Sequence, residues 1–151
     1  MVMEYETAFL GLLISLLFIG ITGIYPGGVI VPSYLVLFVQ SPERIAGTLA
    51  VALLTLLCFK LASNHLILFG TRRFVFMVLV AGLWTFFWLR FFPSLLPASL
   101  EFRVIGWVVP GLIANNFERQ GVLVTTASMV TVTVAVYFLA QMLRLAGLLF
   151  A

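Results

Sequence analysis

Arginine supplies most of the charge in this chain. Eight cations stand against five carboxylates in 151 residues, which leaves a formal net charge of +3, and all the cations except Lys60 are arginines. Five arginines lie at the ends of apolar or Gly/Pro-containing segments: Arg44, Arg72, Arg73, Arg103 and Arg119. A guanidinium binds carboxylates in a bidentate manner and tolerates partial desolvation better than an ammonium does. Each of these arginines alone is explained as an interface anchor, but together they predict a surface that handles anions.

The carboxylates predict ion pairs rather than acid–base catalysis. All five are glutamates: Glu4, Glu6, Glu43, Glu101 and Glu118. We assign the first three to interfacial ion pairs and to the first turns of helices, where negative charge is favourable. Glu101 stands two residues before Arg103 and opens a Gly/Pro-containing segment, so we include this pair in the candidate anion surface.

The sequence supports neither a nucleophilic catalytic site nor a metal site. Cys58 and His65 are the only cysteine and the only histidine, and on a helix their spacing separates them by about 10 Å of rise. No second histidine, second cysteine or aspartate is present to complete a metal site. The only lysine, Lys60, lacks the glycines of a phosphate-binding loop. We therefore expect no catalytic residue, no metal ligand and no cofactor in this chain.

The elements that position these residues must lie in a membrane. Hydrophobic residues make up 64% of the chain, charged residues only 9%, and the mean hydropathy is +1.24. Soluble domains are about 45–50% apolar and about 25% charged, and a protein of this size has too much surface to bury such an excess. Disorder and a disulfide scaffold are excluded as well. The first residues contain no lysine or arginine, so we expect an uncleaved first span rather than a secretory leader.

Four apolar stretches meet the length of about 20 residues that a membrane helix needs. They are Ala8–Ile24, Ile45–Ala62, Phe74–Phe92 and Val122–Met142. Lys60 and Arg90 lie within a turn of their helix ends, from which long side chains reach the interface. The sequence therefore predicts an all-α integral membrane protein with four long transmembrane helices.

Two shorter apolar segments, Tyr25–Val39 and Val104–Asn115, contain glycine and proline. The residues expected to interrupt a regular helix, or to present backbone groups there, are Gly27, Gly28, Pro32, Gly106, Pro110, Gly111 and Asn115. In lipid, the freed backbone groups must find partners in protein or in a water-lined cavity. We expect broken or re-entrant elements inside the helix bundle, with plain kinked spans as the alternative.

The two segments also resemble each other. Gly28 and Pro32 form a G-x-x-x-P pattern that recurs at Gly106 and Pro110, and a Glu-Arg pair follows each pattern. The chain is therefore interpreted as two repeats, 1–70 and 71–151, within a single membrane domain. Paired broken segments in two halves point to a transporter-like site at the repeat interface, whereas a chance match of common residues is the alternative.

The basic loop around Lys60, Arg72 and Arg73 is placed in the cytoplasm, because positive charge is retained on that side. If each broken segment crosses the membrane, each half has three crossings, the halves are inverted, and both termini lie outside. If the segments are re-entrant, four crossings remain and the halves are parallel. The sequence leaves both topologies open.

Three runs resemble one known family over nearly the whole chain: GITGIYPGGVIVPSYL (20–35), LILFGTRRFVFM (66–77) and EFRVIGWVVPGLIANNFERQG (101–121). They are similar to the PgsC/CapC family, the small integral-membrane subunit of the bacterial poly-γ-glutamate synthase. One departure is Ser33, where this family is expected to carry glycine. We interpret it as a sign that close backbone approach is not essential there.

The resemblance implies a multi-pass protein of the bacterial cell membrane that takes part in making and exporting a γ-linked glutamate polymer for a capsule. It implies two partner subunits: an amide ligase, which would carry ATP and a divalent metal, and a membrane-anchored extracellular protein. We expect this chain to be non-catalytic and to contact lipid and polyanion rather than nucleic acid. Arg72 and Arg73 would receive the polymer or dock the ligase, and Glu101 and Arg103 would line the path with the broken segments.

Two other functions compete with a conduit. In the first, the chain is only a scaffold that anchors and activates the ligase. The second is a small-anion transporter, which would need an intramembrane acidic residue for ion coupling. A chain of this size can hardly enclose a polymer path alone, so we expect a homo-oligomer or a path shared with another subunit. Small residues on the last helix offer a packing stripe, and packing within the chain explains them equally well: Ala127, Ser128, Thr131 and Ala135.

Overall fold

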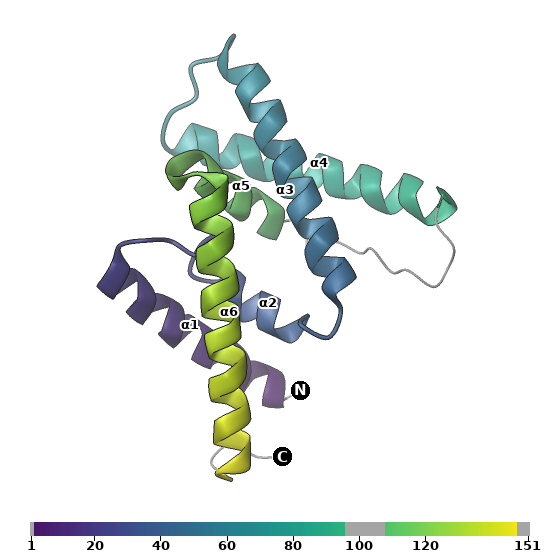
Figure 1. The fold of residues 1–151 in the computed structure, drawn as a ribbon. Coiled ribbons are helices and arrows are strands. Elements are labelled where there is room, and N and C mark those ends of the chain that lie inside the picture. Colours follow the sequence, from purple (N-terminus) through teal and green to yellow (C-terminus); the bar gives the residue numbers. More distant parts are fainter. Residues whose placement is uncertain (1, 96–107, 148–151) are drawn as a thin grey trace. The chain divides into compact units, whose positions relative to one another are not determined.

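The structure is a computed structural model that describes residues 2–95 and 108–147, and the described residues contain helices and no strand (Figure 1). The helices are α1 (Val2–Thr22), α2 (Val31–Leu37), α3 (Pro42–Ser63), α4 (Thr71–Leu95), α5 (Val109–Gln120) and α6 (Val122–Leu145). The prediction of an all-helical chain is confirmed for these residues. Glu101, Arg103 and Gly106 lie outside them.

Four helices are long and apolar enough to cross a membrane, over Glu4–Thr22, Pro42–Ser63, Thr71–Phe91 and Val122–Leu145. They overlap the four predicted spans, and the differences are at the ends. The first helix begins at Val2 instead of Ala8, because Glu4 in its first turn suits the positive end of the helix dipole. It ends before Ile24, where Gly23 adopts a left-handed φ of 69°, a common way to terminate a helix.

The chain forms two compact units. Unit 1 comprises residues 1–40 and 120–151, and unit 2 comprises residues 41–119. Unit 1 therefore contains α1, α2 and α6, and unit 2 contains α3, α4 and nearly all of α5.

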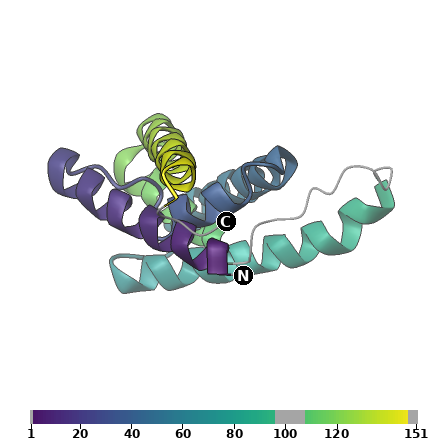
Figure 2. The same cartoon turned by 90° about the horizontal axis from the view of Figure 1, so that it is seen from below.

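In unit 1, the three helices all contact one another, and the short α2 lies against both long helices (Figures 1 and 2). Val36 of α2 forms a buried cluster with Val132 and Val136 of α6, and Ile14 of α1 packs against it. The backbones of α1 and α2 approach closely at Gly11, where an added Cβ would lie 2.8 Å from the Cα of Ser33. Apolar packing and one glycine contact therefore hold the short helix in place.

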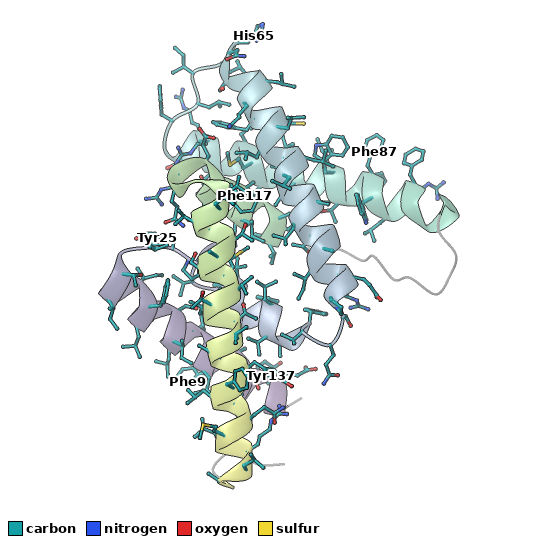
Figure 3. All side chains as sticks on the ribbon, in the orientation of Figure 1. Phe9, Tyr25, His65, Phe87, Phe117 and Tyr137 are labelled. Atoms are coloured by element: carbon teal, nitrogen blue, oxygen red, sulfur yellow. The ribbon has the colours of Figure 1, made fainter. Side chains whose placement is uncertain are left out.

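In unit 2, α3 packs against α4 and crosses it (Figure 1). The Trp84 indole N–H of α4 donates a hydrogen bond to the Cys58 sulfur of α3 at 3.2 Å, and Phe59 and Phe76 pack edge to face at 6.3 Å. Cys58 thus contributes to helix packing. His65 lies exposed in the loop after α3 (Figure 3).

Large apolar side chains cover much of the outer surface. Leu17 is 64% exposed, Phe86 is 69% exposed and Leu123 is 86% exposed, on three of the long helices. Such surfaces are unfavourable in water and are the expected lipid-facing surface of a membrane protein.

The predicted small-residue stripe of α6 divides between two faces. Ser128 is buried and donates a hydrogen bond to the Thr125 carbonyl at 2.9 Å. Ala127, Thr131 and Ala135 are exposed. Packing within the chain therefore accounts for Ser128, and the homo-oligomer stays a prediction.

Candidate functional site

The first Gly/Pro segment leaves the helical conformation between α1 and α2. Gly27 and Gly28 adopt φ values of 74° and 121°, which side-chain-bearing residues rarely adopt. The freed backbone groups of Tyr25 meet the side chain of Gln120. The Tyr25 N–H donates to Gln120 Oε1 at 3.0 Å, and Gln120 Nε2 donates to the Tyr25 carbonyl and to Thr125 Oγ1. One amide side chain thus supplies partners for both backbone groups of Tyr25, as a broken segment needs in lipid.

From that contact the segment follows α6 from the beginning of that helix toward its end. An added Cβ at Gly27 would meet the Met129 side chain, Val36 lies in the buried cluster, and Gln40 lines a cavity with Arg144. Figure 3 places Tyr25 toward the beginning of α6 and Tyr137 toward its end. The 24 residues of α6 span about 36 Å at 1.5 Å per residue. The segment therefore covers most of the length of a membrane-spanning helix and does not fold back to the end where it begins.

The prolines of both segments start helices instead of interrupting them. Pro32 is the second residue of α2, and Pro110 is the second residue of α5. Proline is tolerated in a first turn because the N–H it lacks would have no helical partner there. The break therefore precedes Pro32, at the glycines. In the second segment, Gly111 and Asn115 lie within α5, which continues to Gln120.

In unit 2, α5 lies against the first half of α4. An added Cβ at Gly111 would lie 2.8 Å from the Cα of Val78, so the helices touch backbone to backbone. One turn later, Arg73 Nε donates a part-buried hydrogen bond to Asn115 Oδ1 at 3.2 Å. The structure thus joins a predicted anion-binding arginine to a residue of the second segment. Because an amide is neutral, this contact leaves the positive charge of Arg73 uncompensated.

These two contacts also orient α5. They occur in opposite order along the two helices, so α5 runs back toward the beginning of α4. Arg119 lies one turn, about 6 Å, beyond Asn115 and therefore at the end of unit 2 that holds Arg72 and Arg73. Arg72 and Arg119 are exposed and Arg73 is half-buried. We call these three residues the arginine end of unit 2.

Arg44 does not join this group. It lies half-buried in the first turn of α3, whereas the loop that leads into α4 follows the other end of that helix. About 28 Å of helix separate Arg44 from Ser63.

Two polar features of unit 1 were not predicted from the sequence. One is the bond pair between Gln120 and Tyr25, for which the available signal was an amide side chain directly before a predicted span. The other is a cavity of about 230 Å³ whose mixed lining includes six polar residues. Its polar residues come from three separate stretches of the chain: Glu4, Thr7, Gln40, Tyr137, Gln141 and Arg144. No motif links them, because only packing brings those stretches together.

Comparison with known proteins gives a consistent family assignment. The family described as Capsule biosynthesis CapC matches residues 10–126. The PGA biosynthesis protein CapC of Bacillus subtilis (strain 168) is 41% identical over 126 residues, which cover 82% of this chain and 84% of that protein. The Capsule biosynthesis protein CapC of Bacillus anthracis is 34% identical over 135 residues, covering 88% of this chain and 90% of the relative. No solved structure matches the chain. With the family match and both relatives extending over most of its length, this chain belongs to the capsule biosynthesis CapC family.

Proposed function

We propose that this chain is the membrane subunit of a poly-γ-glutamate synthase and export complex, and that the arginine end of unit 2 guides the polyanionic chain into the membrane. The family assignment supports a role in capsule biosynthesis, and the name of the B. subtilis relative refers to PGA. The ligase and a membrane-anchored extracellular subunit are the proposed partners. ATP and a divalent metal would belong to the ligase.

The hydrogen bond between Arg73 and Asn115 carries this proposal. It holds a guanidinium that keeps its charge against the second Gly/Pro-containing segment, with Arg72 and Arg119 at the same end. Poly-γ-glutamate presents one carboxylate per residue, so several arginines can each hold it briefly. Conduction needs binding that favours entry without trapping, and spaced, partly exposed arginines meet that requirement.

The positive charges near the loop between α3 and α4 predict which side of the membrane the arginine end of unit 2 faces. Lys60, Arg72 and Arg73 flank the loop between α3 and α4, and such clusters are retained in the cytoplasm. The arginine end would then face the compartment in which ATP is available to the ligase. A nascent polymer would meet these guanidiniums first.

The test removes charge at this end while keeping polar side chains. We expect the double variant Arg72→Gln/Arg73→Gln to assemble with the ligase and to reduce extracellular polymer at least tenfold, with polymer retained inside the cell. A hydrogen bond to a charged group contributes about 1.5–3 kcal/mol, and 1.4 kcal/mol corresponds to a factor of ten. Arg103→Gln tests the second segment in the same way.

Arg90→Gln is the matched control, because Arg90 is an exposed arginine near the other end of α4. It should leave polymer yield and length unchanged. Charge-removal variants that assemble and still deliver full-length extracellular polymer would refute the conduit. Loss of synthesis together with loss of ligase co-purification would instead identify the chain as a scaffold.

A further inference from the structure

We propose that the cavity of unit 1 binds a zwitterionic group, with its ammonium at Glu4 and its anionic end at Arg144. The cavity lies where the beginning of α1, the end of α2 and the end of α6 meet. Its volume of about 230 Å³ is several times the roughly 30 Å³ that a water molecule occupies in the liquid. A ligand of several non-hydrogen atoms therefore fits.

The two charges belong to different helices and remain available to a ligand. Glu4 and Arg144 both line the cavity, and among the described residues they form no ion pair with each other. Other lining residues carry groups that donate and accept hydrogen bonds. The Tyr137 hydroxyl accepts a bond from Gln141 Nε2 at 3.3 Å, and the lining residue Thr7 is only 5% exposed.

The sign pattern selects the class of ligand. A simple anion would meet Arg144 but be repelled by Glu4, and a simple cation would experience the reverse. A neutral ligand would form no ionic contact with either Glu4 or Arg144. A group that carries an ammonium and an anion a few bonds apart satisfies both walls with charge-assisted hydrogen bonds, which are stronger than neutral ones.

The position of the cavity allows two sources of this chemistry. It lies at the end of α6, next to exposed aromatic residues: Tyr5 is 71% exposed and Phe138 is 63% exposed. Aromatic side chains are enriched at the membrane–water interface. A phosphatidylethanolamine headgroup would reach the cavity from the bilayer, and a free amino acid would reach it from solution.

The experiment uses the full chain in detergent, stripped of lipid, and measures binding by calorimetry. The probes are glycerophosphoethanolamine, which represents the headgroup, and glycine, which represents the free zwitterion. Acetate and ethylamine are the single-charge controls. We expect at least one zwitterion to bind while acetate and ethylamine do not. Binding of glycerophosphoethanolamine alone would assign the site to lipid, and binding of glycine alone would assign it to an amino acid.

Variants connect the binding to the cavity. Glu4→Gln and Arg144→Gln should each weaken binding about tenfold, as expected from the loss of one charge-assisted hydrogen bond. Glu6→Gln, on the same helix but outside the lining, and Arg90→Gln should bind as the wild type does. Tyr137→Phe removes only one lining hydroxyl and should weaken binding by a smaller factor, which keeps the test decisive if a charge variant does not fold.

Three results would overturn the proposal. They are the absence of binding by both zwitterions, equal binding of acetate or ethylamine, and zwitterion affinities that the two charge variants leave unchanged. Glu4 and Arg144 also suit the dipoles of their helix ends, so their substitution is expected to change stability. The readout is therefore ligand affinity and not melting temperature. Polymer synthesis takes no part in this test, so the proposal stands or falls separately from the proposed function.

Discussion

At the scale of single residues, Ser33 shows how close packing and polarity conflict. Its hydroxyl is buried and has no hydrogen-bond partner among the described residues. We interpreted serine at this position as a sign that close backbone approach is not essential. The structure corrects that interpretation, because the backbones do approach closely and Gly11 on the facing helix provides the space.

Replacing Ser33 with alanine should therefore stabilise the protein. An unsatisfied buried polar group costs about 1–3 kcal/mol, so Ser33→Ala should raise the free energy of unfolding by about 1 kcal/mol in a detergent unfolding titration. Ser128 is the matched control, because it is also buried in unit 1 but donates to the Thr125 carbonyl. Ser128→Ala should lower stability by about 0.5–1.5 kcal/mol. Equal losses for both variants would contradict this account.

At the scale of elements, α1 and α4 bury side chains at corresponding places. Each carries a buried hydroxyl residue that bonds to the carbonyl four residues earlier: Ser15 to Gly11 at 2.7 Å and Thr85 to Ala81 at 2.8 Å. A short helix with proline as its second residue follows each of them in the chain and packs on it through a glycine. These likenesses support the repeats 1–70 and 71–151, which stay a prediction.

The contact between α4 and α5 should tolerate no added side chain. A Cβ at Gly111 would lie 2.8 Å from a backbone atom of α4, so Gly111→Ala forces the helices apart. Overpacking of this kind costs about 1–3 kcal/mol, measurable as a loss of unfolding free energy. Gly20 in α1 has no atom within 4 Å of the equivalent position. Gly20→Ala should therefore be neutral, or stabilising by up to about 1 kcal/mol, since alanine favours helix. A neutral Gly111→Ala would show that the helices do not touch there.

At the scale of the whole molecule, contacts within each unit bear on the number of membrane crossings. Glu4 and Gln40 line the same cavity, so the chain returns to the level where α1 begins before α3 starts. Asn115 contacts Arg73, so it also returns to the beginning of α4 before α6 starts. With the long helices in a bilayer, this pattern favours three crossings for each half. The inverted topology, with both termini outside, stays a prediction.

Cysteine labelling tests that topology. In a Cys58→Ala background, Gln40→Cys and Ala146→Cys should react with an impermeant maleimide added outside intact cells. His65→Cys, in the loop between α3 and α4, should react only after the cells are opened. With the same loop in the cytoplasm, the four-crossing topology also places residue 40 outside, but it places residue 146 in the cytoplasm. Protection of Ala146→Cys in intact cells that label Gln40→Cys would therefore contradict the six-crossing arrangement.

The sequence by itself determined the membrane environment, the all-helical class and the four long helices. These follow from the length of the apolar stretches and from the charges at their ends. It also identified Arg72, Arg73 and Asn115 as residues of interest, but not the pairing of Arg73 with Asn115. That bond joins positions 42 residues apart, and the one between Gln120 and Tyr25 joins positions 95 apart. A helix that is apolar on every side carries no periodic signal of which face meets which neighbour. Packing of the tertiary structure alone decided these pairings and the cavity of unit 1.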